Sequence, residues 1–156
     1  MESDWEVEAM DEQRLAEVLA SGDWPVPPTL AELTGMTEEL AGAILAIAEG
    51  ELEAGRIESA RTILEGMLEA NPRDAAGWVL LARVHRSLRQ PLAARFSAEV
   101  AARLEPESLV TRLARAEGLL PFESERPAAL ELLRSLAGTG GTEGARAGAL
   151  LAAIGG

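Results

Sequence analysis

The sequence AGRIESARTILEGMLEANPRDAAGWVLLARVHRSLRQPLAARFSAEVAARLEP, residues 54–106, repeats one pattern at a fixed interval. Ala60 and Ala94 stand 34 residues apart, and Pro72 and Pro106 keep the same interval. Ala128 continues the alanine series by one further interval. A fixed period of about 20 to 50 residues is typical of proteins built from stacked structural repeats. We therefore predict a repeat architecture.

An interval of 34 residues is the length of a tetratricopeptide repeat, which is two antiparallel helices joined by a tight turn. The composition favours helices, because 47% of the residues are hydrophobic and only 3% are aromatic. The alanine and leucine that dominate lose little side-chain entropy in a helix. We predict an all-α tetratricopeptide-repeat α-solenoid of three helix pairs, with an N-terminal helix and a C-terminal capping helix.

Helix start and stop signals divide the chain. We expect an acidic, disordered lead at 1–9, an N-terminal helix with a Pro-rich linker at 10–36, and the repeats with the capping helix at 37–156. The three repeats are expected at about 41–74, 75–108 and 109–138. Their helices are expected near 38–54, 57–70, 75–88, 91–104, 109–120 and 127–137, and the capping helix near 143–154.

Small residues at equivalent positions are expected to let the two helices of each pair approach closely. On the first helix these are Ala48, Ala82 and Ala116. On the second helix they are Ala60, Ala94 and Ala128, and we expect Leu64 and Leu132 to fill the large site beside them.

The net charge of −12 argues against a nucleic acid or an anionic membrane surface as the partner, because both attract positive charge. No apolar run reaches the roughly 18 residues of a membrane span. The acidic start, MESDWEVEAMDE, lacks the features of a signal peptide. The chain has no cysteine, which allows a reducing compartment. We expect a cytoplasmic protein that binds neither nucleic acid nor membrane.

No motif predicts an enzyme, a cofactor or a metal. Glu49 and Glu53 share a helical face, but no nucleophile accompanies them, so a solvated charged face is favoured over a catalytic pair. His85 is the only histidine, and a packing or surface role is favoured over metal binding. The stretch GTGG, residues 138–141, lacks the lysine of a phosphate-binding loop and is expected to be a flexible linker.

The order of these segments resembles the class II chaperones of type III secretion, the translocator chaperones. TLAELTGMTEEL at 29–40 resembles the family's entry to its first repeat. AGRIESA at 54–60 resembles a family turn, and AEGLL at 116–120 resembles a family motif in the third repeat. The chain departs from the family in having no tyrosine and only Phe96 and Phe122 as phenylalanines.

The resemblance implies a bacterial, cytoplasmic, non-enzymatic chaperone that needs no cofactor. Its partner would be an extended segment of a secreted translocator protein, held on the concave face of the repeats. The residues expected on that face come from the first helix of each repeat: Leu45, Glu49, Leu52, Val79, Arg83, Arg86, Leu113, Glu117 and Leu120. The N-terminal helix would form a homodimer contact through Leu15, Val18 and Leu19.

Several alternatives stay open. The apolar residues of the expected groove also suit packing within a repeat, and Arg83 and Arg86 also suit a solvated surface. The N-terminal helix equally suits an intramolecular cap. A general tetratricopeptide scaffold, or a chaperone for a needle subunit, would share the same repeats.

Overall fold

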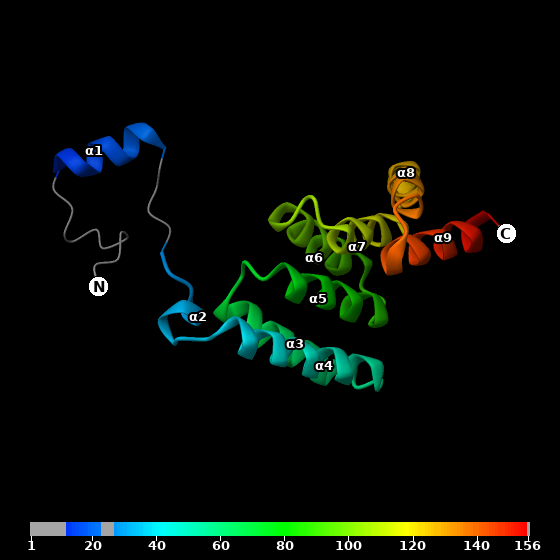
Figure 1. Ribbon diagram of the computed structural model, residues 1–156, viewed down its shortest axis with the longest axis horizontal. Helices are drawn as coiled ribbons and strands as arrows, with labels where there is room; N and C mark the ends of the chain where they lie inside the picture. The colour runs from blue at the N-terminus through cyan, green and yellow to red at the C-terminus, as the bar shows by residue number, and fades with distance from the viewer. Residues whose placement is uncertain (1–11, 23–26, 156) are drawn as a thin grey trace.

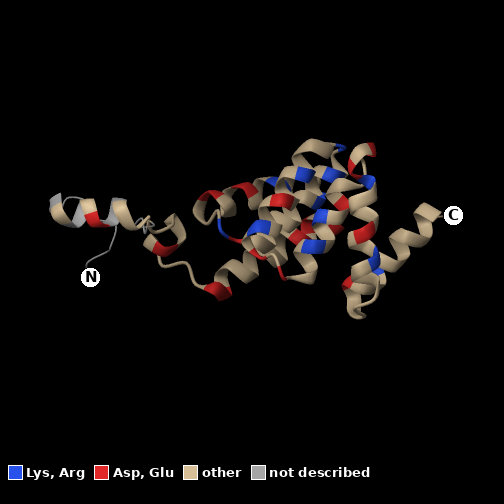
Figure 2. Ribbon diagram, turned by 90° about the horizontal axis from the view of Figure 1, so that it is seen from above, with Lys and Arg blue, Asp and Glu red and all other residues tan. Residues whose placement is uncertain are grey.

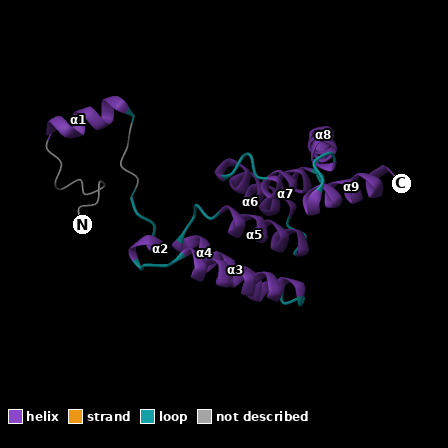
Figure 3. Cartoon of the chain, in the orientation of Figure 1, coloured by secondary structure: helices purple, strands orange, loops and turns teal. Residues whose placement is uncertain are grey.

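The computed structural model describes residues 12–22 and 27–155, and every regular element within these residues is helical. Figures 1 and 3 show helices α3 to α9 stacked in chain order, with α1 lying away from them. The predicted all-α repeat fold is therefore confirmed. The predicted disordered lead at 1–9 lies outside the described residues.

The helix bounds follow the start and stop signals closely. The N-terminal part holds α1 (Glu12–Ser21) and α2 (Leu30–Leu33). The three pairs are α3 (Glu38–Glu53) with α4 (Ile57–Ala70), α5 (Ala75–Ser87) with α6 (Pro91–Leu104), and α7 (Leu109–Leu119) with α8 (Arg126–Ala137). The chain ends in α9 (Gly141–Gly155), so part of the expected glycine linker is helical.

Side-chain caps explain where the first helices begin. At α2, the Thr29 hydroxyl accepts a hydrogen bond from the Glu32 N–H, and the Glu32 carboxylate accepts one from the Thr29 N–H. Thr37 caps α3 by accepting from the Leu40 N–H at 3.1 Å, and Asp74 caps α5 by accepting from the Gly77 N–H at 2.9 Å. These bonds satisfy N–H groups that have no acceptor within the helix.

The turns within the first two pairs share one backbone conformation. Gly55, after α3, has a φ of 80°, and Arg89, at the same position after α5, has a φ of 57°. Glycine adopts this left-handed region without cost, whereas a residue with a Cβ is strained there. The second repeat therefore makes the same turn as the first with a less suitable residue.

The core follows the small and large sites in the first two repeats. Ala48, Ala60, Ala82 and Ala94 are all buried, and Leu64 is fully buried between the helices. In the first two repeats, residues that are 34 positions apart therefore occupy equivalent sites in the core.

The third repeat departs from this spacing. Ala128 is exposed and Ala129 is buried in its place, while Leu133 rather than Leu132 is fully buried. The connection between α7 and α8 contains a 3₁₀ turn, η2 (Glu123–Glu125), where the earlier repeats have a tight turn. This longer connection moves α8 by one residue relative to the pattern, so the prediction of Ala128 as a core site was wrong. Leu132 is only partly buried, but it packs against the core as expected.

Helix α9 covers the end of the solenoid. It packs against α8 and also contacts α7, as α5 packs against α4 and contacts α3. Its Ala147 is buried in a cluster with Ala116, Leu133 and Leu136. Helix α9 thus takes the place of the first helix of a fourth pair, as a terminal cap should. Among the described residues, no helix is long and apolar enough to cross a membrane.

Candidate peptide-binding groove

The first helices of the pairs line the inner side of the curved stack. Helix α3 contacts α5, α5 contacts α7, and α7 contacts α9. No comparable contact joins α4, α6 and α8 within the described part of the chain. Helices that touch on one side and diverge on the other form a curved stack, so α3, α5, α7 and α9 lie on the concave face.

The apolar residues expected on this face take part in packing. Leu52 is only 9% exposed and belongs to the core between α3, α4 and α5, so it does not offer a free binding surface. Leu45, Val79, Leu113 and Leu120 are half-buried and pack against the core clusters. Leu52 therefore packs within the solenoid, as the alternative interpretation of the sequence allowed. The other four residues pack there with only part of their surface.

The charged residues of this face join successive repeats. Nη1 of Arg83 on α5 donates a hydrogen bond to Oε1 of Glu49 on α3 at 2.9 Å. Both side chains are partly exposed to solvent. The two residues are therefore paired with each other while both remain in contact with solvent.

A second set of charges surrounds Glu117, which is only 8% exposed. Its carboxylate forms ion pairs with Arg86 on α5 and with Arg146 on α9, whose Nε lies 3.3 Å from Oε1. Burial, and then the charges of Arg146 and Arg83, lower the pKa of Arg86 to about 10. Arg86 thus remains charged at neutral pH, in a place where positive charges crowd one another.

Two pockets open along helix α5. The amino-end pocket has a volume of about 370 Å³ and lies beside the first turns of α3 and α5. Gly42, Leu45 and Ala76 line it on the concave side, and Glu38 and Asp74 stand at the helix starts. This pocket combines a small apolar surface with acidic side chains and with Arg73, which is paired with Glu32.

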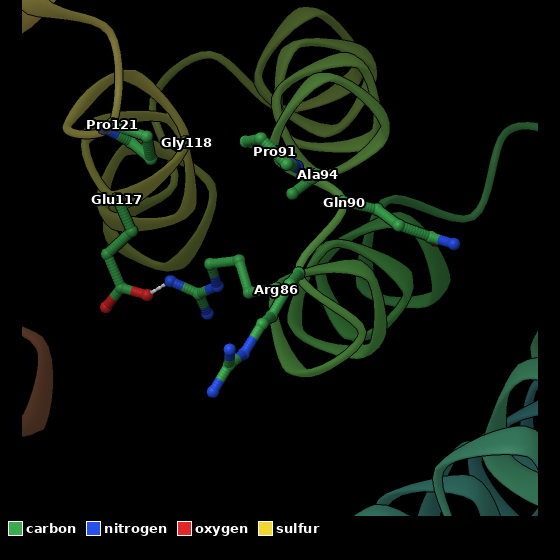
Figure 4. Close-up of a pocket in the computed structure, with 8 residues that line it drawn as sticks. Arg86, Gln90, Pro91, Ala94, Glu117, Gly118 and Pro121 are labelled. Atoms are coloured by element: carbon green, nitrogen blue, oxygen red, sulfur yellow. Dashed lines mark ion pairs between the residues drawn. The ribbon is translucent and has the colours of Figure 1, made fainter.

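The carboxyl-end pocket has a volume of about 460 Å³ and lies at the other end of α5. Figure 4 shows it between the start of α6, where Gln90 and Pro91 lie, and helix α7, which carries Glu117. Arg86 reaches across this space to the Glu117 carboxylate. The pocket therefore has an ion pair at its base.

The structure adds groove residues that the sequence reasoning missed. Gly42 and Ala76 are exposed and occupy the same position in successive repeats, where their small side chains leave room for the amino-end pocket. Because Gly42 and Ala76 are 34 residues apart, the repeat spacing could have identified them as groove residues. Arg89 and Pro121 line the carboxyl-end pocket from turns, and no repeat spacing marks turn residues as binding groups.

The expected dimer contact cannot be placed in the same way. Leu15, Val18 and Leu19 belong to α1, but their side chains lie outside the described residues. Helices α2 and α3 expose apolar side chains to solvent: Leu30, Leu33, Leu40 and Ile47.

His85, the histidine considered as a metal ligand, has a hydrogen-bond partner. Nδ1 of His85 lies 2.7 Å from Oε1 of Gln90, within the turn that follows α5. The described residues contain no group of three or more histidine, aspartate or glutamate side chains that could hold a metal ion. His85 therefore has a local role in the turn.

Comparison with known proteins agrees with this architecture. A tetratricopeptide-repeat family model matches residues 41–84, which cover most of α3, all of α4 and most of α5. A comparison with curated proteins found no match.

Several solved structures resemble the chain. The translocator chaperone SycD of Yersinia enterocolitica is 18% identical, with a TM-score of 0.68 over 82% of this chain and 99% of that one. A type III secretion complex from Aeromonas hydrophila is 20% identical, with a TM-score of 0.68 over 92% and 95% of the two chains. PcrH, in complex with the chaperone binding region of PopD, is 22% identical, with a TM-score of 0.64 over 77% and 94%. The chain thus has the fold of these chaperones.

Proposed function

We propose that this protein is a cytoplasmic, non-enzymatic chaperone that binds an extended segment of a type III secretion translocator and keeps it competent for export. The observation that carries the proposal is the pair of pockets at the two ends of α5, one of the helices that line the concave face. The resemblance to PcrH, whose complex holds the chaperone binding region of PopD, supports a translocator as the client.

The spacing of the pockets suits an extended peptide. Ala76 and Arg86 line the two pockets and lie on the same helix. At 1.5 Å of rise per residue they are about 15 Å apart along the helix axis. An extended chain advances about 3.3 Å per residue, so roughly four to five client residues would span the distance. We therefore expect two anchor side chains with this separation in the client.

The shallow apolar surfaces also suit a chaperone. Leu45 and Val79 keep part of their surface free, and Gly42 and Ala76 let a peptide backbone approach the inner helices. Burial of apolar client side chains would supply about 25 cal/mol per Å², from which the cost of ordering the peptide is subtracted. A segment held in this way would be unavailable for premature association.

The test is to fill the amino-end pocket. Ala76 is exposed, so Ala76→Trp would add a large side chain within the groove without disturbing the core. The probe is a set of overlapping peptides that covers the translocators encoded beside this protein's gene. We expect the peptides that bind the wild type to lose at least about tenfold in affinity, which corresponds to about 1.4 kcal/mol.

Ala149→Trp is the matched control, because Ala149 is exposed on α9 and lines neither pocket. It should leave the affinity unchanged. The proposal fails if no translocator peptide binds the wild type, or if the protein is isolated from its cell in a stable assembly that contains no translocator.

We also propose that the N-terminal part mediates a homodimer. The exposed apolar side chains of α2 and α3 offer a surface for a second copy, and the sequence of α1 has an apolar stripe of its own. One of the similar SycD structures is described as an alternative dimer. Val18→Glu should convert the dimer into a monomer in sedimentation experiments. A wild type that is already monomeric would remove the proposal.

A further inference from the structure

The carboxyl-end pocket is rich in positive charge within an acidic protein. Arg86 and Arg89 line it, and Arg146 reaches its base through Glu117. Glu117 is the one carboxylate among the residues that line the pocket. The pocket is thus lined by two arginines and one carboxylate, and that carboxylate is already paired with Arg86 and Arg146, in a chain whose net charge is −12. Figure 2 shows arginines interspersed with acidic residues along the helices of the solenoid.

Arg89 is the arginine of this group that has no partner. It is exposed, and no ion pair or hydrogen bond joins its side chain to any other residue in the described part of the chain. Its backbone stays in the left-handed region with a φ of 57°, where Gly55 of the preceding repeat avoids the strain. Strained residues are often found at binding sites. The turn itself does not require arginine at position 89, so the guanidinium is free to bind a ligand at the pocket.

The rest of the pocket suits a short carbon chain. Pro91, Ala94, Gly118 and Pro121 provide an apolar lining beside the arginines. Pro91 is at the start of α6, which has no side-chain cap, so the positive end of the helix also faces this region. An apolar lining with cationic groups at its edge matches a side chain of one or two methylenes that ends in a carboxylate.

We propose that this pocket binds an aspartate or glutamate side chain of the client segment, with the carboxylate placed between Arg89 and Arg86. The inference rests on the proposed function, and it assigns a specific residue class to one end of the bound segment. The acidic residue would lie about four to five residues from the side chain in the amino-end pocket, given the rise of α5 and of an extended peptide. The amino-end pocket is lined by three acidic residues, Glu38, Asp74 and Glu105, and by one arginine, Arg73, which is paired with Glu32, so it would disfavour an acidic client side chain there.

The experiment uses the full-length protein and the tightest-binding translocator peptide of the overlapping set. Each aspartate or glutamate of that peptide is changed in turn to the corresponding amide. At one position the wild-type protein should prefer the acidic peptide by about tenfold, as expected for a charge-assisted hydrogen bond. The preference should fall as salt rises, because the pocket is open to solvent.

Arg89→Gly should abolish this preference, so that the acidic and amide peptides bind equally. Glycine suits the backbone at this position, and a loss of binding would therefore not arise from unfolding. Arg89→Lys keeps the charge and should retain most of the preference. Arg103→Gln is the matched control for lost charge: Arg103 is exposed in the last turn of α6, far from the pocket, and this change should leave the preference intact.

The outcomes separate the two proposals. If no peptide of the set binds the wild type, the proposed function fails. If peptides bind but every acidic-to-amide change leaves the affinity unchanged, or if Arg89→Gly keeps the full preference, the chaperone proposal stands and the acidic-residue site is overturned.

Discussion

Glu49 and Arg83 occupy the same position in successive repeats, and their side chains form a hydrogen-bonded ion pair of 2.9 Å across the groove. The pair connects α3 with α5 at a place where the inner helices meet. Repeat proteins gain stability from the contacts between neighbouring units. The energy of this pair is therefore part of the energy that holds the first repeat against the second.

A double-mutant cycle with Glu49→Gln and Arg83→Gln should give a coupling energy of about 0.2 to 1 kcal/mol, because the two side chains remain exposed and screened by solvent. Urea unfolding of the four proteins measures it. The coupling should shrink when the salt concentration is raised to about 0.5 M. A coupling energy above about 2 kcal/mol would show that the pair is not a surface interaction.

The ion pairs of Glu117 with Arg86 and Arg146 should contribute more to stability than the Glu49–Arg83 pair, because Glu117 is buried and pairs with two arginines. Glu117→Gln leaves Arg86 and Arg146 without their shared counter-charge. We expect the free energy of unfolding to fall by about 1 to 3 kcal/mol, because the variant loses the charge-assisted hydrogen bonds of a buried carboxylate. The same change at Glu49 is the control and should cost less than about 1 kcal/mol. Equal losses for the two variants would contradict this assignment.

The fold could be predicted because it depends on local signals that repeat along the chain. Thr37 and Asp74 mark helix starts, Gly55 marks a turn, and the spaced alanines mark close helix contacts. Each signal acts over a few residues, so one sequence suffices to find it. The prediction was wrong at Ala128, where the longer α7–α8 connection shifts the pattern by a single residue.

The groove could be predicted only in part. Repeat position correctly brings Glu49 and Arg83 to one face, but it does not tell how deeply a side chain is buried. Leu52 shares this face by spacing and is nevertheless enclosed by α4 and α5. Arg146 reaches Glu117 only because α9 folds back onto the last pair, a tertiary contact that no repeat spacing encodes.

The left-handed backbone at Arg89 predicts a stabilising substitution. A residue with a Cβ pays roughly 1 kcal/mol in this region, and glycine does not. Arg89→Gly should raise the free energy of unfolding by about 0.5 to 1 kcal/mol in urea, although glycine also increases the entropy of the unfolded chain. The reverse change at the equivalent position, Gly55→Arg, should lower it by a similar amount. A loss of stability in Arg89→Gly would show that the arginine side chain itself supports the turn.

Two glycines of α9 provide a final test of how the capping helix is seated. A Cβ at Gly144 would lie 3.1 Å from the Leu136 carbonyl oxygen, whereas a Cβ at Gly148 would meet no atom within 4 Å. Gly144→Ala should therefore lower the free energy of unfolding by about 1 kcal/mol, since the crowding exceeds the gain in helix propensity. Gly148→Ala, with only that gain, should raise it by up to about 1 kcal/mol. Because α9 carries Arg146, the first change should also weaken the ion pair with Glu117. If both alanine variants are stabilised, α9 is not packed on α8 as closely as this contact implies.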